Sequence, residues 1–214
     1  MVIKRALSTS FVLALAAGML FAQDAGPKVA HTTHFGPIKA ATSSVGSAKL
    51  IFSNLAPPPA AAYNDTSGYY VLGPDNSVGF SEQWIGVPFI PKNNSHVTTL
   101  QVAVQWISGS TSFVIGLYSD NGGTVGSLLA SAEGDATSTF GTCCQLVTVS
   151  IPSTAVTRGK QYWIVASSDD VNAPDFTGVF DASATQIIAY NESASTWGSF
   201  TTNTPAAAAW GTIP

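Results

Sequence analysis

Charged side chains are scarce in this 214-residue chain, where they make up only 9% of the residues. Lysine and arginine number 8 against 12 acidic residues, which gives a net charge of −4. Nucleic-acid binding needs clustered basic side chains that neutralise phosphates, so this composition argues against a nucleic-acid partner. The chain has only 3 histidines and 2 cysteines, which excludes a disulfide-rich scaffold and leaves few ligands for a zinc site.

A convincing amphipathic helical pattern is also missing, whereas hydrophobic residues make up 45% of the chain and can supply a core. Leu100, Val102, Val104 and Trp106 alternate with polar or small residues, which is the period of a half-buried strand. Other short apolar runs predict strands at 50–52, within 78–90, and at 113–117, 127–132, 146–151, 161–167, 177–180, 186–190 and 197–201. Strands so short and so closely spaced predict an all-β fold, an antiparallel β-sandwich of jelly-roll type.

Two local expectations follow from the turns between these strands. The strands at 99–106 and 113–117 flank a Gly-Ser turn at 108–110, which predicts an antiparallel hairpin. Residues 119–123 contain an Asn-Gly step, which tolerates the positive φ of a tight turn. In the strand at 161–167, the alternation places Trp163 and Tyr162 on opposite faces, one in the core and one at the surface.

The N-terminal segment has the pattern of a secretory signal peptide. Lys4 and Arg5 precede a charge-free stretch from 6 to 22, which is shorter than the roughly 20 apolar residues that span a bilayer. We therefore expect a cleaved signal peptide at 1–22, a flexible leader at 23–47 and a single β-sandwich domain at 48–214. The mature protein is then secreted, with no membrane span after signal removal.

A resemblance rests on two stretches read in order. Residues 117–129 read LYSDNGGTVGSLL, and residues 159–165 read GKQYWIV. This pattern resembles the bacterial exported β-sandwich modules called choice-of-anchor domains. Val125 stands where proline is common, and the C-terminal anchoring segment of those modules is missing here, which favours a freely secreted form. The resemblance implies a β-sandwich fold and export from the cell, and it implies no catalytic residues.

Aromatic and acidic residues supply the candidate binding sites. Exposed aromatic rings on a sandwich suit stacking against sugars, and the candidates least tied to the strand period or set among aromatic neighbours are Trp197, Tyr69, Tyr70 and Trp84. Oxygen-rich loops at strand ends can hold calcium, and such a loop carries Asp169, Asp170, Asn172 and Asp175. The alternative for this second set is a solvated acidic loop, and no other cofactor is expected.

Cys143 and Cys144 are adjacent in the chain. Export favours oxidation, and their position before a predicted strand is a turn, where a strained vicinal disulfide is feasible. The alternative is a pair of unbonded thiols.

Catalytic residues are few. His96 is the only histidine in the predicted domain, and Glu82 has aromatic neighbours but no evident second carboxylate. We therefore expect no enzyme. The sequence favours a secreted structural or adhesive protein outside the cell, and the alternative is a carbohydrate-binding module, stabilised by calcium if the acidic loop binds it. The extracellular partner, a polysaccharide or a protein, is not specified by the sequence.

Overall fold

The computed structural model describes residues 31–33, 47–55, 67–74, 82–137, 145–168, 176–192 and 196–214. Every regular element in these ranges is a β-strand, and adjacent strands pair antiparallel. The strands are β1 (His31–Thr33), β2 (Lys49–Ser53), β3 (Ser67–Leu72), β4 (Gln83–Phe89), β5 (Ser95–Ser108), β6 (Ser112–Asp120), β7 (Val125–Asp135), β8 (Gln145–Val156), β9 (Tyr162–Ser167), β10 (Phe176–Glu192), β11 (Thr196–Pro205) and β12 (Ala207–Thr212).

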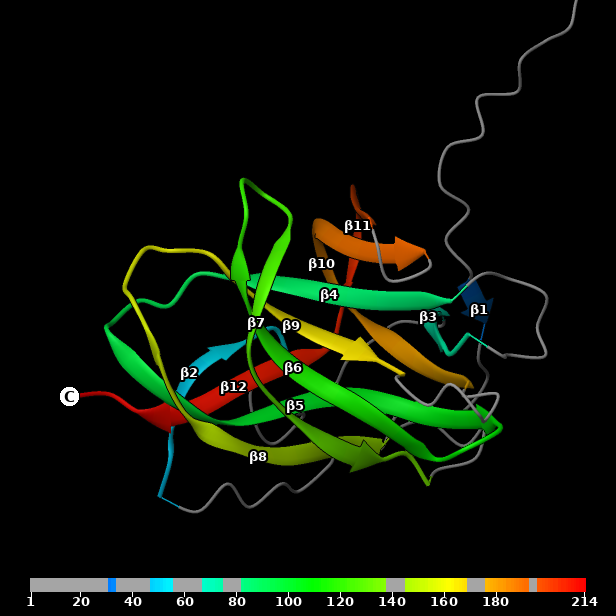
Figure 1. Cartoon of the computed structure of the whole chain (residues 1–214), viewed down its shortest axis with the longest axis horizontal. Helices are drawn as coiled ribbons and strands as arrows, with labels where there is room; N and C mark the ends of the chain where they lie inside the picture. Colours follow the sequence, from blue (N-terminus) through cyan, green and yellow to red (C-terminus); the bar gives the residue numbers. More distant parts are fainter. Residues whose placement is uncertain are drawn as a thin grey trace, which may run out of the picture.

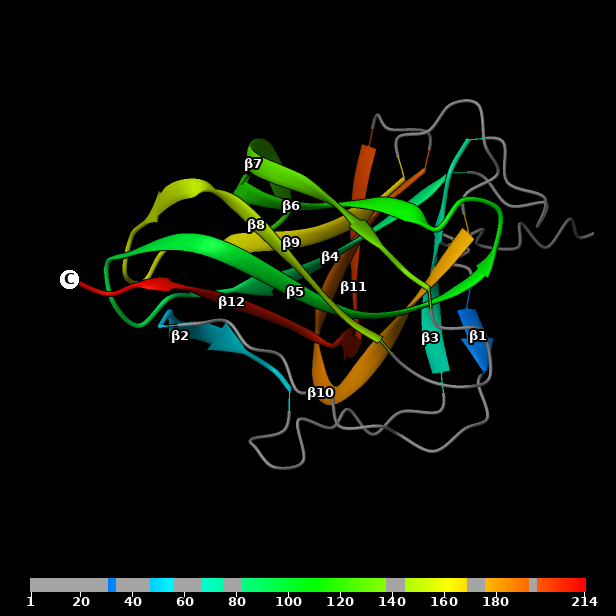
Figure 2. The ribbon, with the colours of Figure 1, turned by 90° about the horizontal axis from the view of Figure 1, so that it is seen from below.

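These strands form two layers that face each other (Figures 1 and 2). The first sheet contains β2, β12, β5 and β8 in that order, and the second contains β4, β9, β6 and β7. β10 connects the layers, because its first residues pair with β5 and β3 and its last four pair with β4. The predicted antiparallel β-sandwich is confirmed. Its jelly-roll connectivity stays a prediction, and the signal peptide lies outside the described residues.

The core lies between the two layers and follows from the alternation in the sequence. Leu100, Val102 and Val104 of β5 belong to one buried cluster with Ile115 and Leu117 of β6. Successive side chains of a strand point to opposite faces, so each sheet can direct every second residue into this shared core. The antiparallel layers thus bury the residues that the sequence pattern had marked as apolar.

The hairpin predicted for β5 and β6 is wrong. β5 pairs with β8, β12 and β10, whereas β6 pairs with β7 and β9. The turn at 108–111 therefore carries the chain from the first sheet to the second across the core. Gly109 has a φ of 77°, and its carbonyl oxygen accepts a hydrogen bond from Trp106 Nε1 at 3.1 Å, which braces this corner. By contrast, the turn predicted at 119–123 does join paired strands, β6 and β7.

The expectation of one buried and one exposed ring at β9 is also wrong. Tyr162 is 8% exposed and Trp163 is fully buried. β9 lies between β4 and β6, so both of its edges are paired, and its outer face is covered as well. A second, smaller core there contains Trp163, Val165 and Val125, with Trp84, Tyr118 and Trp197 packed against it.

Three strands were not predicted. β3 and the alanine-rich β12 contribute buried residues to the main core. β1 lies within the expected leader and pairs with Ser67–Tyr69 of β3, so part of 23–47 has regular structure. The two predicted strands at 177–180 and 186–190 are one strand, β10, with a register break between Ala182 and Thr185.

Candidate functional site

Asp120 links the two stretches 117–129 and 159–165 by hydrogen bonds. Its Oδ1 accepts hydrogen bonds from Trp163 Nε1 at 2.8 Å and from Gln161 Nε2 at 2.7 Å. Its Oδ2 accepts the backbone N–H of Gly123 at 3.0 Å, within a turn whose glycines have positive φ. One carboxylate therefore closes the β6–β7 turn and holds the start of β9, a contact that the sequence analysis missed.

These donors also change the acidity of Asp120. Burial by itself would raise the pKa of this carboxyl, but hydrogen bonds from the Gly123 N–H, Trp163, Gln161 and the Gly122 N–H stabilise the charged form. The net result is a pKa below the usual value. Asp120 is consequently ionised, and its oxygens are occupied by neighbouring donors. Its carboxylate therefore acts as a structural link, or brace, between the β6–β7 turn and the start of β9.

Two of the four predicted aromatic ligands meet on the outer face of the second sheet. The rings of Trp84 and Trp197 are 6.3 Å apart, and Tyr118 lies 6.5 Å from Trp197. All three are half-buried and pack against the small buried cluster of Trp163, Val165 and Val125. We call Trp84, Tyr118 and Trp197 the outer aromatic cluster. Aromatic rings that are partly open to solvent can stack against the apolar face of a sugar.

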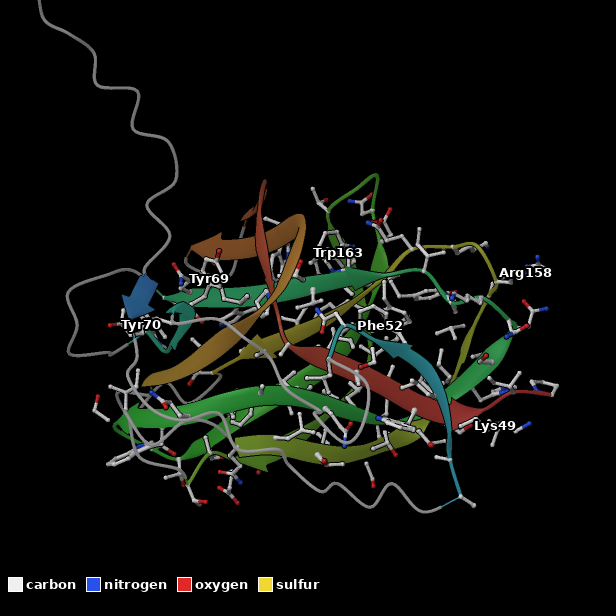
Figure 3. The ribbon with its side chains drawn as sticks, turned by 180° about the vertical axis from the view of Figure 1, so that it is seen from behind. Lys49, Phe52, Tyr69, Tyr70, Arg158 and Trp163 are labelled. Carbon is white, nitrogen blue, oxygen red and sulfur yellow. The ribbon has the colours of Figure 1, made fainter. Side chains whose placement is uncertain are left out.

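The other two predicted aromatics do not join this cluster. Tyr69 is fully buried in the main core, so its ring is not offered to a ligand at the surface. Tyr70 is half-buried and packs near Leu72. Figure 3 shows both tyrosines on β3, at the end of the molecule opposite Lys49 and Arg158. The sequence did not show which of these four rings are buried and which are partly open to solvent. Adjacent residues on a strand point to opposite faces, and the sequence did not identify the buried face of β3.

The predicted calcium ligands and cysteines lie outside the described residues. This applies to Asp169, Asp170, Asn172 and Asp175, and to Cys143 and Cys144. Among the residues that the structure describes, no three His, Cys, Asp or Glu side chains gather closely enough to hold a metal ion. The same ranges contain no helix long and apolar enough to cross a bilayer. The calcium site and the vicinal disulfide stay predictions.

Glu82 and His96 are not brought together. Glu82 immediately precedes β4, and His96 follows the other end of that strand, at the start of β5 and exposed. Seven extended residues span roughly 20 Å, which separates the two groups beyond the reach of a shared reaction centre. Burial raises the pKa of Glu82 above its usual value, and the polar edge of the Trp84 side chain partly offsets this rise. Glu82 thus borders the outer aromatic cluster.

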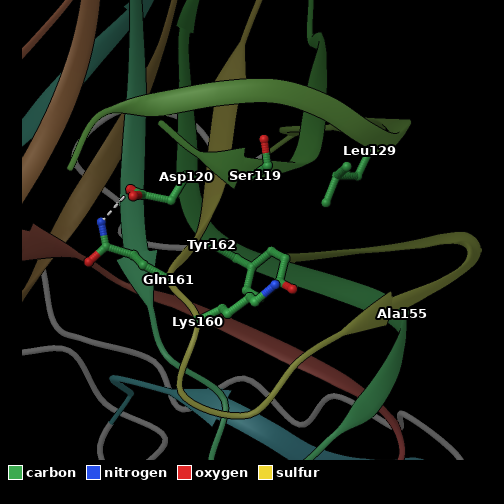
Figure 4. Close-up of a pocket in the computed structure, with 7 residues that line it drawn as sticks. All are labelled: Ser119, Asp120, Leu129, Ala155, Lys160, Gln161 and Tyr162. Atoms are coloured by element: carbon green, nitrogen blue, oxygen red, sulfur yellow. Dashed lines mark hydrogen bonds between the residues drawn. The ribbon is translucent and has the colours of Figure 1, made fainter. Parts of the chain in front are cut away.

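A hollow of about 480 Å³ opens where β6 ends and β9 begins (Figure 4). It is lined by Ser119, Asp120, Leu129, Ala155, Lys160, Gln161 and Tyr162. A smaller hollow of about 270 Å³ is lined by Phe52, Pro88, Phe89, Ile90 and also Gln161. The two hollows adjoin at Gln161. Neither hollow could be predicted from the sequence, since their walls combine residues of six strands and two loops that are far apart in the chain.

A scan against protein-family models, a search of curated proteins and a search of solved structures each find no match to this chain. The resemblance to choice-of-anchor domains therefore stays a prediction that rests on the two quoted stretches.

Proposed function

We propose that this protein is a secreted, non-enzymatic β-sandwich module with a structural or adhesive role outside the cell. The observation that carries the proposal is the hydrogen bonding of Asp120. The carboxylate of the family-like pattern is bonded to Trp163, Gln161 and the Gly123 N–H, so this stretch serves the integrity of the sandwich. A carboxylate that accepts three charge-assisted hydrogen bonds from two segments holds these segments together, which supports a structural role.

Export and adhesion are tested separately. The full chain is expressed in a bacterial host, and the N-terminus of the protein recovered from the medium is sequenced. We expect removal of residues 1–22, and retention of the intact chain inside the cells would contradict the proposal. Beads coated with the secreted protein are then tested for adhesion to cell walls, with beads coated with urea-unfolded protein as the control. Adhesion no stronger than that of the control would remove the adhesive role.

A second candidate function is carbohydrate binding at the outer aromatic cluster. The specific observation in its favour is the approach of Trp84 and Trp197 to 6.3 Å on one partly open face. Trp84 is held in place, since its Nε1 donates to the carbonyl oxygen of Ser168 at 3.2 Å. A ring fixed in this way loses little conformational entropy when a sugar stacks on it.

An array of neutral and charged polysaccharides, probed with calcium and with chelator, tests this second candidate. Saturable binding that is lost in Trp197→Ala supports it, and loss of binding with chelator supports the calcium site as well. Trp210→Ala is the matched control, because Trp210 is also half-buried but lies on β12 of the first sheet. Equal binding by both variants would exclude the outer aromatic cluster as the site.

A further inference from the structure

Basic side chains are gathered at one end of the sandwich. The structure describes four lysines and arginines, and all of them are exposed: Lys49, Lys92, Arg158 and Lys160. We call these four residues the basic end. None of them forms an ion pair within the described residues, although Lys49 Nζ lies 3.5 Å from the carbonyl oxygen of Ile213. In a chain of net charge −4, this places the described positive charge on one small part of the surface.

The pairing of strands and loops produces this concentration. Arg158 and Lys160 lie in the loop from β8 to β9, and Lys92 lies in the loop from β4 to β5. The two loops are bonded, since Gly159 N donates to the Pro91 carbonyl oxygen at 3.1 Å and Arg158 N donates to Asn94 Oδ1 at 2.9 Å.

Lys49 reaches the same end through the first sheet. It pairs with Gly211 of β12, which pairs with Val97 near the start of β5. Figure 3 shows Lys49 and Arg158 together at this end. Strands from both layers therefore contribute to the basic end.

Acidic residues of β7 lie at the opposite end. Asp135 pairs with Ser112 at the start of β6, whereas Ser119 at the end of β6 pairs with Tyr162, two residues after Lys160. Glu133 lies beside Asp135 on the same strand. Among the described residues, the positive side chains therefore gather at one end, and Glu133 and Asp135 lie at the other, and this asymmetry would orient an anionic partner.

The larger hollow opens at the basic end and has the chemistry of a sugar site. Lys160 supplies a cation to its wall, and Leu129 and Ala155 supply apolar surface. The hydroxyls of Ser119 and Tyr162 accept backbone N–H groups of Ser127 and Thr157, which fixes their positions and leaves their own protons to donate. Asp120 also lines the hollow, but its Oδ1 faces the Gln161 donor (Figure 4) and also accepts from Trp163.

We propose that the basic end and the adjoining hollow bind an acidic polysaccharide, whose carboxylates pair with Lys92, Arg158 and Lys160 while one sugar ring occupies the hollow. The smaller hollow, joined at Gln161, extends the track along Phe89 and Ile90 for a neighbouring ring. This inference rests on the proposed extracellular role and names the partner class. A polymer of charged sugars fits better than an isolated anion, because the cations are spread around a surface and do not converge on one point.

Polygalacturonate is the probe, and its fully methyl-esterified form is the neutral control with the same sugar backbone. Binding of the purified protein is measured by titration at low salt and again at about 0.5 M salt, where exposed charges are largely screened. We expect saturable binding to the acid form that weakens with salt, and binding to the ester at least about tenfold weaker, a loss of about 1.4 kcal/mol. Equal binding to both forms would overturn the proposal.

Charge variants locate the site. Exposed ion pairs are individually weak, so the triple variant Lys92→Gln, Arg158→Gln, Lys160→Gln should bind about three- to a hundredfold more weakly. The matched control is Glu133→Gln with Asp135→Asn at the opposite end, which changes net charge without touching the site and should leave affinity within about twofold. Unchanged affinity in the triple variant would overturn the proposal.

Two adjacent leucines test the hollow itself. Leu128 and Leu129 are 51% and 40% exposed, but only Leu129 lines the hollow. Leu129→Ser should weaken binding, and Leu128→Ser should not. Double-stranded DNA is a polyanion whose charges lie on phosphates between deoxyribose rings and not on carboxylated pyranose rings, so DNA binding as tight as that of polygalacturonate would contradict a site for an acidic polysaccharide. Polygalacturonate binding by a protein that is not exported would contradict the proposed function and leave the binding site standing.

Discussion

Gln101 and Gln105 lie on the same face of β5 and are both buried, yet their surroundings differ. Gln101 Nε2 donates to Thr148 Oγ1 at 3.0 Å, and its Oε1 accepts from Trp210 Nε1 at 2.6 Å. Neither Nε2 nor Oε1 of Gln105 has a hydrogen-bond partner among the residues that the structure describes. A buried polar group without a partner costs free energy, so Gln101 stabilises the folded state and Gln105 destabilises it.

Replacing each glutamine with methionine, which has a similar shape, should therefore have opposite effects. Gln105→Met removes two unpaired polar atoms and should raise the free energy of unfolding by about 1 to 3 kcal/mol. Gln101→Met leaves the Trp210 indole without its acceptor and should lower it by about 1 kcal/mol. Urea unfolding monitored by tryptophan fluorescence gives both values. A decrease for Gln105→Met would show that the amide is satisfied in solution.

Asp120→Asn tests the brace at the β6–β7 turn. An amide offers one oxygen where the carboxylate offers two, so either Trp163 Nε1 or the Gly123 N–H must face the new NH₂ group. Whichever donor faces the NH₂ group, one hydrogen bond to a charged acceptor is lost, which should lower the free energy of unfolding by about 1 to 3 kcal/mol. The exposed Asp135→Asn is the matched control, with an expected change within about 0.5 kcal/mol. Equal losses in the two variants would contradict the brace.

At the scale of elements, β7 and β8 lie side by side without forming a hydrogen-bonded ladder. Gly134 of β7 makes this approach feasible, because a Cβ at this position would lie 2.7 Å from Val147 Cγ1 and 3.1 Å from Val149 Cγ1. Gly134→Ala should overpack this contact and cost about 1 to 3 kcal/mol of stability. Val147→Ala in the same chain removes the nearer obstacle, so a double-mutant cycle should show favourable coupling of at least about 0.5 kcal/mol. Strictly additive losses would mean that the two strands do not touch there.

The strand pattern predicted which residues are extended, but not always which strands are neighbours. Alternation in β5 and β6 marks one buried face on each strand, and this condition is met equally by a hairpin and by strands facing each other across a core. Whether β5 and β6 pair depends on whether β5 has an unpaired edge, which the local sequence does not show. Both edges of β5 are already paired, with β8 and with β12, so β6 cannot pair with it. The prediction of a hairpin failed for this reason.

β12 was missed because alanine favours strands weakly, and its pairing is made by close packing between backbones. A Cβ at Gly211 would overlap with the carbonyl oxygen of His96, so glycine is required where β12 meets β5. The candidate site shows the same limit. Trp84 and Trp197 were singled out from the sequence, whereas the partnership of Asp120 with Trp163 and the two hollows depend on contacts between residues far apart in the chain.

At the scale of the whole molecule, stability should depend on pH through two carboxyls with opposite signs. The pKa of Asp120 is lowered in the folded state, so its contribution is present above the unfolded pKa of about 3.9 and is lost as pH falls through the folded pKa. The pKa of Glu82 is raised, so the folded state loses stability as pH rises from the unfolded pKa through the folded one. Acid should therefore remove the stabilising contribution of ionised Asp120 and also remove the destabilising effect of ionised Glu82.

Urea midpoints measured from pH 7 down to about pH 3, for the unmodified protein and for two variants, separate these contributions. Asp120→Asn should be less stable than the unmodified protein at pH 7, and the gap should narrow below about pH 4 as the carboxylate of the unmodified protein becomes protonated. Glu82→Gln should be more stable at pH 7, because the amide carries no charge to bury beside Trp84, and its advantage should vanish in acid. A gap for Asp120→Asn that stays constant with pH would mean that its effect comes from geometry alone and not from the charge that holds β6 and β9 together.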